Sequence, residues 1–447
     1  MKIFIFILTI IFITGCAKNV PTPEEVHEKT VKKQKFNEPK TWEKVKDDGT
    51  VNTNWIKTFN DPTLEKLVTE ALQNNKEIRS LKFQVDRSKT LIKKAAAALK
   101  PTIDLNGKYK SRNSDELSEI HGGSLNVSWE ADVWGRLKLA KSSSVQNAQA
   151  TQADYEFARQ SLVASTAKAW NMTITSKLQT NYAKSVVSLF EKELKIITAK
   201  HNIGQVDKRN VYIAKINLTS AKNAYSKSLV SYEDAQRSLE LLLGRYPSSS
   251  IKSTNKMAIL LYSIPVGIPS EILERRPDLV AAQQRVASVF YKQKEAELLH
   301  LPKFKFSVGL SINSLGNAVT DLLSGIFTPL YKGGAIEAEV ESATSVQKQS
   351  IEEYAQKVLV AFKEVETTLS LEEKLLEQEN YLNQIVLDNK KTLELTKIAY
   401  TVGKVEYLDV SQLNNRLISS EISLIDISSK RVFNRINLHL ALGGAFE

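Results

Sequence analysis

The side chains that most often carry chemistry are few in this chain of 447 residues. Cys16 is the only cysteine, which leaves no pair of thiols for a disulfide and no set of thiolates for a metal ion. The histidines are scattered without the spacing of metal ligands, at His27, His121, His201, His300 and His439. There is no glycine-rich phosphate loop and no nucleophile elbow. The sequence therefore predicts neither an enzyme, nor a cofactor, nor a metal centre.

Cys16 ends a segment that predicts export and lipid modification. Lys2 precedes an apolar run over residues 3–13, which is too short to span a bilayer. A charged start, a short apolar core and small residues are typical of a secretory signal, so residues 1–15 are predicted to be a signal peptide. The Ile-Thr-Gly-Cys order resembles a bacterial lipobox, in which the cysteine is acylated after cleavage. Ala17 stands where an aspartate would favour inner-membrane retention, so we expect the outer membrane. An ordinary signal with an incidental cysteine is the alternative.

Charge and hydropathy narrow the class of protein further. The formal net charge is +11, but the 61 Lys and Arg residues are spread among 50 Asp and Glu residues along helical patterns. This distribution favours solvated helix faces over nucleic-acid binding. No later segment approaches about 18 consecutive apolar residues, so no transmembrane helix is predicted. Residues 16–54 are polar and rich in Pro, Lys and Glu, and predict a lipidated tether without a core.

Two parts of the chain repeat one another. A shift of about 199 residues aligns residues 201–244 with residues 400–443 without a gap, and glycines coincide near both ends. Such self-similarity indicates a duplicated structural unit. It predicts a first repeat over residues 55–244, an equatorial segment over 245–268 and a second repeat over 269–443.

Each repeat reads as a helix, two strands, a very long helix and a returning helix. The first helix is expected from about residue 61 to residue 100. Apolar and polar residues alternate in four strand candidates, at about 102–112, 124–133, 303–313 and 322–331. Strands of this length can cross a bilayer, but the smallest closed bacterial barrels use 8 of them. If these strands enter a membrane, several copies of the chain must combine.

Several motifs together resemble one protein family. The order Ile-Leu-Glu-Arg-Arg-Pro-Asp-Leu at residues 272–279 is similar to the LxxRRPD signature of TolC-type outer-membrane efflux proteins. Asp61-Pro62, residues 132–137 (Asp-Val-Trp-Gly-Arg-Leu) and residues 329–334 (Pro-Leu-Tyr-Lys-Gly-Gly) resemble further family blocks. In order and spacing these motifs cover nearly all of the chain after the tether. The lipobox points to the lipoprotein subgroup.

The resemblance implies a mostly α fold of the α+β class. Three chains would form a homotrimer with a 12-stranded outer-membrane β-barrel, continued by a periplasmic α-helical barrel. The implied partners are a periplasmic membrane-fusion adaptor, an inner-membrane efflux transporter and outer-membrane lipid. The implied function is that of a passive conduit for drugs or other small molecules. A conduit for metal efflux or type I protein secretion is an alternative, as is a periplasmic adaptor or scaffold lipoprotein.

The signature residues Glu274, Arg275, Arg276, Pro277 and Asp278 have a structural interpretation. Pro277 suits the first turn of a helix, and Asp278 places negative charge near the amino end of that helix. Glu274 and the two arginines are expected to form a charge cluster that fixes the equatorial belt.

The turns after the long helices are the candidate transport site. Gly204 and Gly403 follow these helices, where a positive φ is useful. The resemblance implies that these turns, with Val206 and Val405, form the periplasmic tip and meet the adaptor. Val405 also stands where the family has a basic tether residue.

Tyr400 and Asp409 match the family's gate pattern. The resemblance implies that the tyrosine tethers the closed state and that the aspartate joins a ring that narrows the lumen. Gln412 replaces a second acidic residue of that pattern. A ring of three Asp409 residues is predicted to form a cation-sensitive constriction. The alternative is that Asp409 merely caps the returning helix.

Overall fold

The computed structural model describes most of the chain after the tether. The described residues are 42, 54–110, 120–258, 260, 271–312 and 318–444, with the side chains of 108–110, 120 and 121 left out. Cys16 and the predicted signal peptide lie outside this part of the chain. The chain divides into two compact units. The first contains residues 81–155 and 277–359, and the second contains residues 38–80, 156–276 and 360–447.

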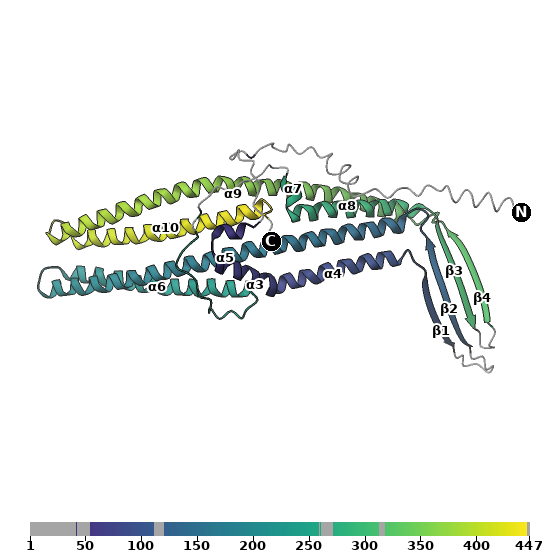
Figure 1. Ribbon diagram of the computed structural model, residues 1–447, viewed down its shortest axis with the longest axis horizontal. Coiled ribbons are helices and arrows are strands. Elements are labelled where there is room, and N and C mark those ends of the chain that lie inside the picture. Colours follow the sequence, from purple (N-terminus) through teal and green to yellow (C-terminus); the bar gives the residue numbers. More distant parts are fainter. Residues whose placement is uncertain are drawn as a thin grey trace. The chain divides into compact units, whose positions relative to one another are not determined.

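The long helices repeat with the spacing seen in the sequence (Figure 1). Helix α5 (Arg136–Asn202) and helix α9 (Ala335–Thr401) each have 67 residues. They are followed by α6 (Lys208–Leu242) and α10 (Tyr407–Ala441), which each have 35 residues. Helices α9 and α10 begin 199 residues after α5 and α6, respectively. A helix of 67 residues is about 100 Å long, so each long helix needs packing partners along its length.

The expectation of a single helix over residues 61–100 is wrong, because the helix is interrupted at Asn75. A short 3-10 helix, η1 (Trp55–Phe59), precedes α3 (Pro62–Asn74) and α4 (Lys76–Ala97). Asp61 caps α3 as expected, since its Oδ1 accepts the backbone N–H of Thr63 at 2.9 Å. Asn75 has extended backbone, and its Oδ1 accepts the N–H groups of the next helix at 2.9 and 3.1 Å. The side chain of Asn75 therefore starts a second helix.

The second repeat contains an equivalent break at Arg276. Helix α7 (Ile272–Arg275) ends there, and α8 (Pro277–Glu297) and the 3-10 helix η3 (Leu298–His300) follow. In each repeat the side chain at the break binds the last carbonyl of the returning helix. Asn75 Nδ2 donates to Leu242 O at 3.0 Å, and Arg276 Nη1 donates to Ala441 O at 3.3 Å. The two repeats thus share an equivalent hydrogen bond, which asparagine makes in the first repeat and arginine makes in the second.

The duplicated glycines at the ends of the repeats allow these breaks to pack closely. A Cβ on Gly244 would lie 2.6 Å from Asn74 O, and a Cβ on Gly443 would lie 3.0 Å from the carbonyl carbon of Arg275. Both glycines also have positive φ, of 71° and 69°. A side chain at either position would therefore collide with main chain that cannot move freely.

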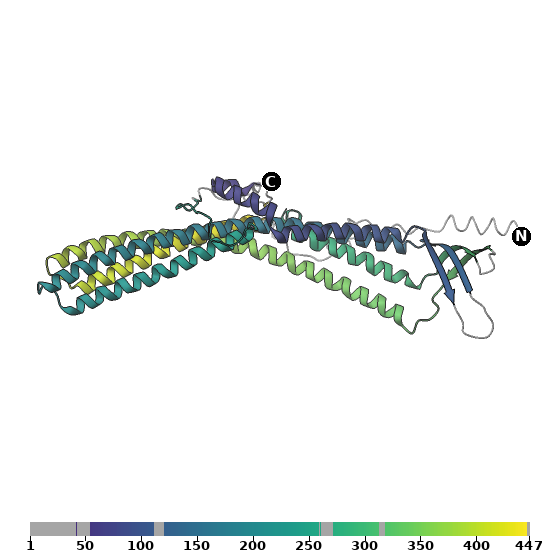
Figure 2. The ribbon, with the colours of Figure 1, turned by 90° about the horizontal axis from the view of Figure 1, so that it is seen from below.

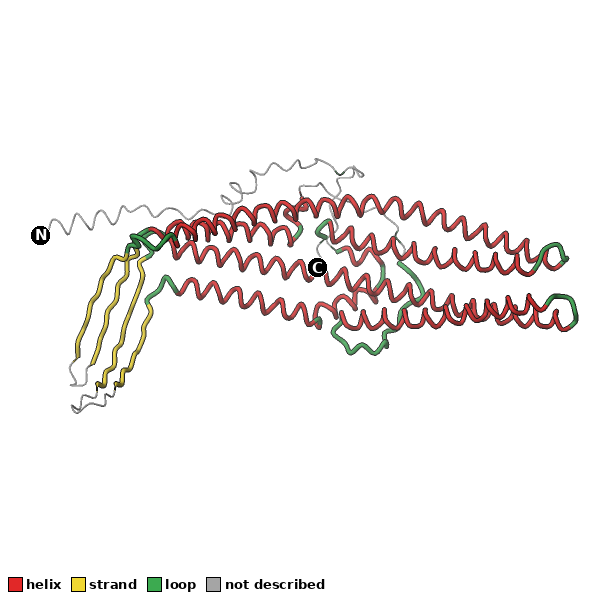
Figure 3. Tube along the Cα trace, turned by 180° about the vertical axis from the view of Figure 1, so that it is seen from behind, coloured by secondary structure: helices red, strands yellow, loops and turns green. Residues whose placement is uncertain are grey.

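The four strands lie side by side in one antiparallel sheet (Figure 3), in the order β1-β2-β3-β4 (Figure 1). Their bounds are Thr102–Lys110, Ile120–Ala131, Lys303–Ile312 and Ala318–Phe327. The predicted range 322–331 for the fourth strand is wrong, because β4 ends at Phe327. Pro329 lacks the N–H that a longer ladder would need. Among the described residues, no helix is long and apolar enough to cross a membrane.

The buried carboxylate of Glu240 holds the loop that follows α6 in the second unit. The carboxylate of Glu240 accepts the backbone N–H groups of Ser249 and Ser250, both at 2.7 Å, and the Ser250 hydroxyl at 3.0 Å. Burial alone would raise the pKa of Glu240, but these donors outweigh it and lower the pKa. Arg245 adds a bidentate ion pair with Glu70, at 2.5 and 2.6 Å.

His439 is buried in the second unit, and no described residue pairs with it as an opposite charge. Its ring stacks on Trp55 with centroids 5.1 Å apart, and its side chain is 2% exposed. Burial, followed by the positive charge of Arg435, lowers the pKa of His439 from 6.5 to about 3. The folded protein therefore holds His439 neutral at neutral pH.

This burial predicts that acid destabilises the protein. Below pH 6.5 the imidazole of His439 binds a proton in the unfolded chain but not in the folded chain. The stability of the folded protein that depends on neutral His439 is complete above pH 6.5 and is lost as the pH falls toward 3. Below pH 6.5 we expect the free energy of unfolding to fall by about 1.4 kcal/mol per pH unit. Thermal unfolding in detergent between pH 7.5 and 4.5 measures this slope. His439→Phe keeps the stacking on Trp55 and should flatten the pH dependence. Equal slopes in both proteins would contradict the assignment.

Candidate functional site

The register of the sheet places apolar and polar residues on opposite faces. Directly opposed residues of a ladder share a face, so each row across the sheet can be read from the pairing. Apolar rows are Ile103–Val127–Val308–Leu322 and Leu105–Leu125–Leu310–Thr320. The other face carries Thr102–Ser128–Ser307–Leu323 and Asp104–Asn126–Gly309–Asp321. A sheet with these two faces is typical of strands that lie between lipid and an aqueous lumen.

Two tryptophans mark the end of the sheet from which the helices continue. The ring of Trp129 stacks on Phe306 with centroids 6.0 Å apart. Trp129 and Trp134 donate their ring N–H groups to the main-chain carbonyls of Leu99 and Pro302, at 3.0 and 2.7 Å. Indoles that combine an apolar body with a satisfied N–H are typical of membrane interfaces.

Gly204 and Gly403 close the long helices with the same geometry. Their φ angles are 75° and 73°, which is the left-handed region that favours glycine. After each glycine, the next residue donates its N–H to the carbonyl five positions earlier, at 2.9 Å. Val206 and Val405, beside the turns, are half-buried. The turns of both hairpins are thus built as the sequence predicts.

Near these turns the two helical hairpins lie side by side (Figure 2), and they share a hydrophobic core. All four long helices contribute to it. Its buried members are Ile197 of α5, Val211 and Ala214 of α6, Leu393 of α9, and Tyr407 and Val410 of α10. Val206 and Tyr400 pack against this core. The tip is therefore one packed body, and relative movement of the hairpins must expose apolar surface.

Glu193 joins α5 to α10 within this tip. Its Oε2 accepts the Tyr407 hydroxyl at 3.0 Å, and its Oε1 accepts the Asn414 amide at 2.7 Å. The side chains of both donors are buried, at 3% and 2% exposure. Burial, and then the negative charge of Glu193, raises the pKa of Tyr407. Because both donors are buried, the loss of Glu193 would leave the Tyr407 O–H and the Asn414 amide N–H without their acceptor.

A second bond between the hairpins lies at the surface. Arg209, near the start of α6, pairs with Glu406 at 3.0 Å. Their side chains are 64% and 67% exposed, so water screens the pair. An exposed pair of this kind contributes about 1 kcal/mol or less. The buried Glu193 network therefore contributes more to the joining of the hairpins than this ion pair does.

Asp409 takes part in the cap of α10. Its Oδ2 accepts the backbone N–H of Glu406 at 3.0 Å, and the Glu406 side chain accepts the N–H of Asp409 in return. Together they form a capping box. The carboxylate is on an exposed residue. Asp409 thus caps α10, as the alternative interpretation predicts. The exposed carboxylate keeps its charge in this cap and can also attract cations.

Tyr400 lies at the tip without a hydrogen bond from its hydroxyl among the described residues. The amine of Lys200 stands 4.4 Å from its ring centroid, and the ring of Tyr407 is 6.1 Å away. Within one chain the hydroxyl that bonds across the hairpins is that of Tyr407, and the tether role of Tyr400 stays a prediction. The bond between Tyr407 and Glu193 does not follow from sequence patterns, because the two residues are 214 positions apart.

The two signature arginines each pair with a carboxylate other than that of Glu274. Arg276 is 4% exposed and binds Glu364 Oε2 at 2.6 Å, which joins α9 to the break before α8. Arg275 pairs with Glu271 at 2.9 Å. The expected contribution of Glu274 to the cluster is wrong, because Glu274 is exposed and makes no ion pair within the described part of the chain. Pro277 begins α8, and Asp278 lies in its first turn.

Comparison with known proteins decides the family. A sequence model of the outer membrane efflux protein family matches residues 67–245 and 268–444. The chain belongs to this family. It is therefore an outer-membrane efflux channel protein, and the mostly α fold with few strands is the fold of this family.

Relatives of this efflux protein extend over most of its length. The cation efflux system protein CusC of Escherichia coli O6:H1 is 27% identical over 420 residues, which are 89% of each chain. The probable outer membrane lipoprotein SilC of Salmonella typhimurium is 25% identical over 414 residues, or 88% of each chain. The crystal structure of the Campylobacter jejuni CmeC outer membrane channel has a TM-score of 0.83 and 21% identity, covering 90% of each chain.

Proposed function

We propose that three copies of this efflux protein form a continuous conduit from the periplasm through the outer membrane. The observation that carries this proposal is the register of the sheet, which places most apolar side chains of the four strands on one face and most polar side chains on the other. Strands β1 and β4 are the edges of that sheet, and an edge needs a partner. Neighbouring copies supply the partner, so that three chains close a 12-stranded barrel. Their helical hairpins continue it as a hollow α-barrel.

The conduit acts passively and depends on two partners. A periplasmic membrane-fusion adaptor binds the tip turns at Gly204, Val206, Gly403 and Val405, and an inner-membrane transporter supplies the energy. The support for this assignment is that both turns are exposed ends of a packed tip. We infer that the chain itself catalyses no reaction. Within the described residues no group of three or more His, Cys, Asp or Glu residues could hold a metal ion.

The cargo is a small molecule, for which organic compounds and metal ions are the two candidates. We favour drugs and other organic molecules, and the polar face of the sheet with its apolar β4 residues supports this choice. Metal efflux is the second candidate because CusC, a cation efflux protein, is 27% identical over 89% of this chain.

Reconstitution of the full chain tests the assembly. We expect the protein purified in detergent to migrate as a trimer that resists dissociation. In planar bilayers it should conduct in discrete steps. A monomer that inserts no conducting channel would contradict the proposal.

The proposed gate at Asp409 can be separated from the helix cap. Asn keeps a side-chain oxygen for the cap of α10, so Asp409→Asn removes charge and preserves structure. If three Asp409 residues form a ring, block of the single-channel current by hexaamminecobalt(III) should weaken several-fold in this variant. Asp207→Asn, at the equivalent cap of α6, is the control for loss of charge at the tip. Unchanged conductance and block in Asp409→Asn would exclude the gate role.

Lipid attachment at Cys16 is likewise a proposal. Cells that express the full chain should incorporate labelled palmitate into it, and Cys16→Ser should abolish the label. The measurement is autoradiography of the immunoprecipitated protein, with the mass of the mature amino end as a second readout. An unlabelled wild-type protein would show that the cysteine is incidental to an ordinary signal.

A further inference from the structure

Strand β4 departs from the polarity of the face on which its residues lie. In the register Val319, Leu323 and Phe327 stand opposite Ser311, Ser307 and Lys303 of β3. They therefore share the face that is polar on the other three strands. Their exposed fractions are 46%, 67% and 60%. Apolar side chains on the aqueous side of a barrel are not explained by contact with lipid.

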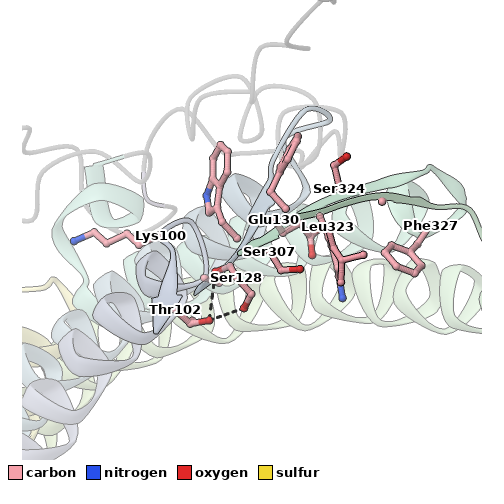
Figure 4. Close-up of a pocket in the computed structure, with 13 residues that line it drawn as sticks. Lys100, Thr102, Ser128, Glu130, Ser307, Leu323, Ser324 and Phe327 are labelled. Atoms are coloured by element: carbon pink, nitrogen blue, oxygen red, sulfur yellow. Dashed lines mark hydrogen bonds between the residues drawn. The ribbon is translucent and has the colours of Figure 1, made fainter. Parts of the chain in front are cut away.

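Two of these apolar residues line a cavity of about 480 Å³ at the end of the sheet that joins the helices (Figure 4). Leu323 and Phe327 contribute to its apolar lining, together with Ala98, Trp129 and Phe306. The remaining lining includes hydroxyl groups of Thr102, Ser128 and Ser307 and the amines of Lys100 and Lys305. Figure 4 places Lys100 and Phe327 on opposite sides of the cavity. A volume of this size is typical of pockets that hold a drug-sized molecule.

The charge of the cavity is positive. Glu130 is its only carboxylate among the lining residues, and that carboxylate binds Arg136 at 2.9 Å. Lys100 and Lys305 make no ion pair within the described residues. The Lys305 amine lies 5.8 Å from the ring centroid of Phe327, so a cation stands beside the apolar wall. An occupant that matches both features has an apolar body and an anionic group.

We propose that this cavity is a subsite of the export path for amphiphilic organic anions. The apolar body of the cargo packs on Leu323 and Phe327, and its anionic group binds Lys305 and Lys100. The inference rests on the proposed barrel, because only closure of the sheet makes this face the wall of an aqueous lumen. It names the class of cargo that the conduit favours.

Labelling of single cysteines tests both steps separately. Leu323→Cys and Leu322→Cys are adjacent and lie on opposite faces, and they are introduced together with Cys16→Ser so that each chain has one thiol. The trimer is reconstituted in phosphatidylcholine vesicles and treated with a membrane-impermeant methanethiosulfonate. Lumenal exposure predicts fast labelling at Leu323→Cys and labelling at least tenfold slower at Leu322→Cys. Equal rates would contradict the barrel itself.

Protection from labelling then tests the subsite. We expect 2-naphthalenesulfonate to slow labelling of Leu323→Cys at least threefold. The same ring with a trimethylammonium group, and inorganic sulfate, should have no effect. When Lys305→Gln is combined with Leu323→Cys, the protection should disappear. Protection is the ratio of the labelling rates without and with the probe, taken within one variant. An effect of the lost charge on the labelling rate itself therefore cancels. Equal protection by the cationic probe, or no protection by the anionic one, would overturn the subsite while leaving the barrel established.

Discussion

Replacement of Glu193 by alanine should open the tip of the channel. The buried Tyr407 hydroxyl and Asn414 amide would lose their acceptor, at a cost of about 1–3 kcal/mol for each group left without a partner. These bonds join α5 to α10, so their loss favours separation of the two hairpins. We expect a rise of the single-channel conductance of several-fold in planar bilayers. Cells with this variant should also become sensitive to large antibiotics that the outer membrane excludes.

The neighbouring Glu191 provides a matched control for this prediction. It lies on the same helix and pairs with Lys222 of α6 at 3.2 Å, with side chains 52% and 56% exposed. That pair connects two helices of one hairpin and contributes about 1 kcal/mol or less. Glu191→Ala should therefore leave the conductance unchanged. If both variants raised the conductance equally, loss of charge and not the α5–α10 link would be the cause.

Replacement of Arg276 by methionine should destabilise the trimer most among the signature residues. Methionine fills similar space but removes the ion pair with Glu364 and the hydrogen bond to Ala441 O. Loss of one partner from a fully buried pair is strongly destabilising. Because Glu364 is 47% exposed and can be hydrated, we expect a smaller loss, of about 2–3 kcal/mol per protomer. Thermal dissociation of the trimer in detergent measures the effect.

Arg275 is the control at the adjacent position. It forms its ion pair with Glu271 at the surface, with side chains 34% and 39% exposed. Arg275→Met should therefore lower stability by less than about 1 kcal/mol. Equal losses from the two variants would show that the signature arginines act through general charge and not through the buried contact.

The alternation of apolar and polar residues predicts the sheet well, because successive side chains of a strand point to opposite faces. The alternation over residues 303–313 becomes one apolar face, and the register aligns it with the alternation of β2. Prediction failed at β4, where Leu322 and Leu323 are both apolar and no alternation fixes the range. The helix break at Asn75 also escaped prediction, since asparagine is tolerated within helices and only its capping bonds reveal the break.

The candidate site was predictable only where it depends on the main chain. Gly204 and Gly403 follow from the helix ends that they must close. The partners of Arg276 and Glu193 do not follow from the sequence, because the pairs lie 88 and 214 residues apart. The resemblance implied Tyr400 as the tether, which stays a prediction, and the hydroxyl that bonds Glu193 within the chain belongs to Tyr407. The two tyrosines lie on either side of the turn at Gly403, and only packing of the hairpins decides which hydroxyl meets Glu193.

Accumulation of a fluorescent amphiphilic dye, in cells with and without this gene, tests the export conduit most directly. The deletion strain should accumulate more dye, a plasmid copy should restore the wild-type level, and an uncoupler should abolish the difference because the transporter supplies the energy. Equal accumulation in both strains would contradict a conduit for organic molecules. Equal dye levels with copper retained in the deletion strain would assign the conduit to metal efflux instead.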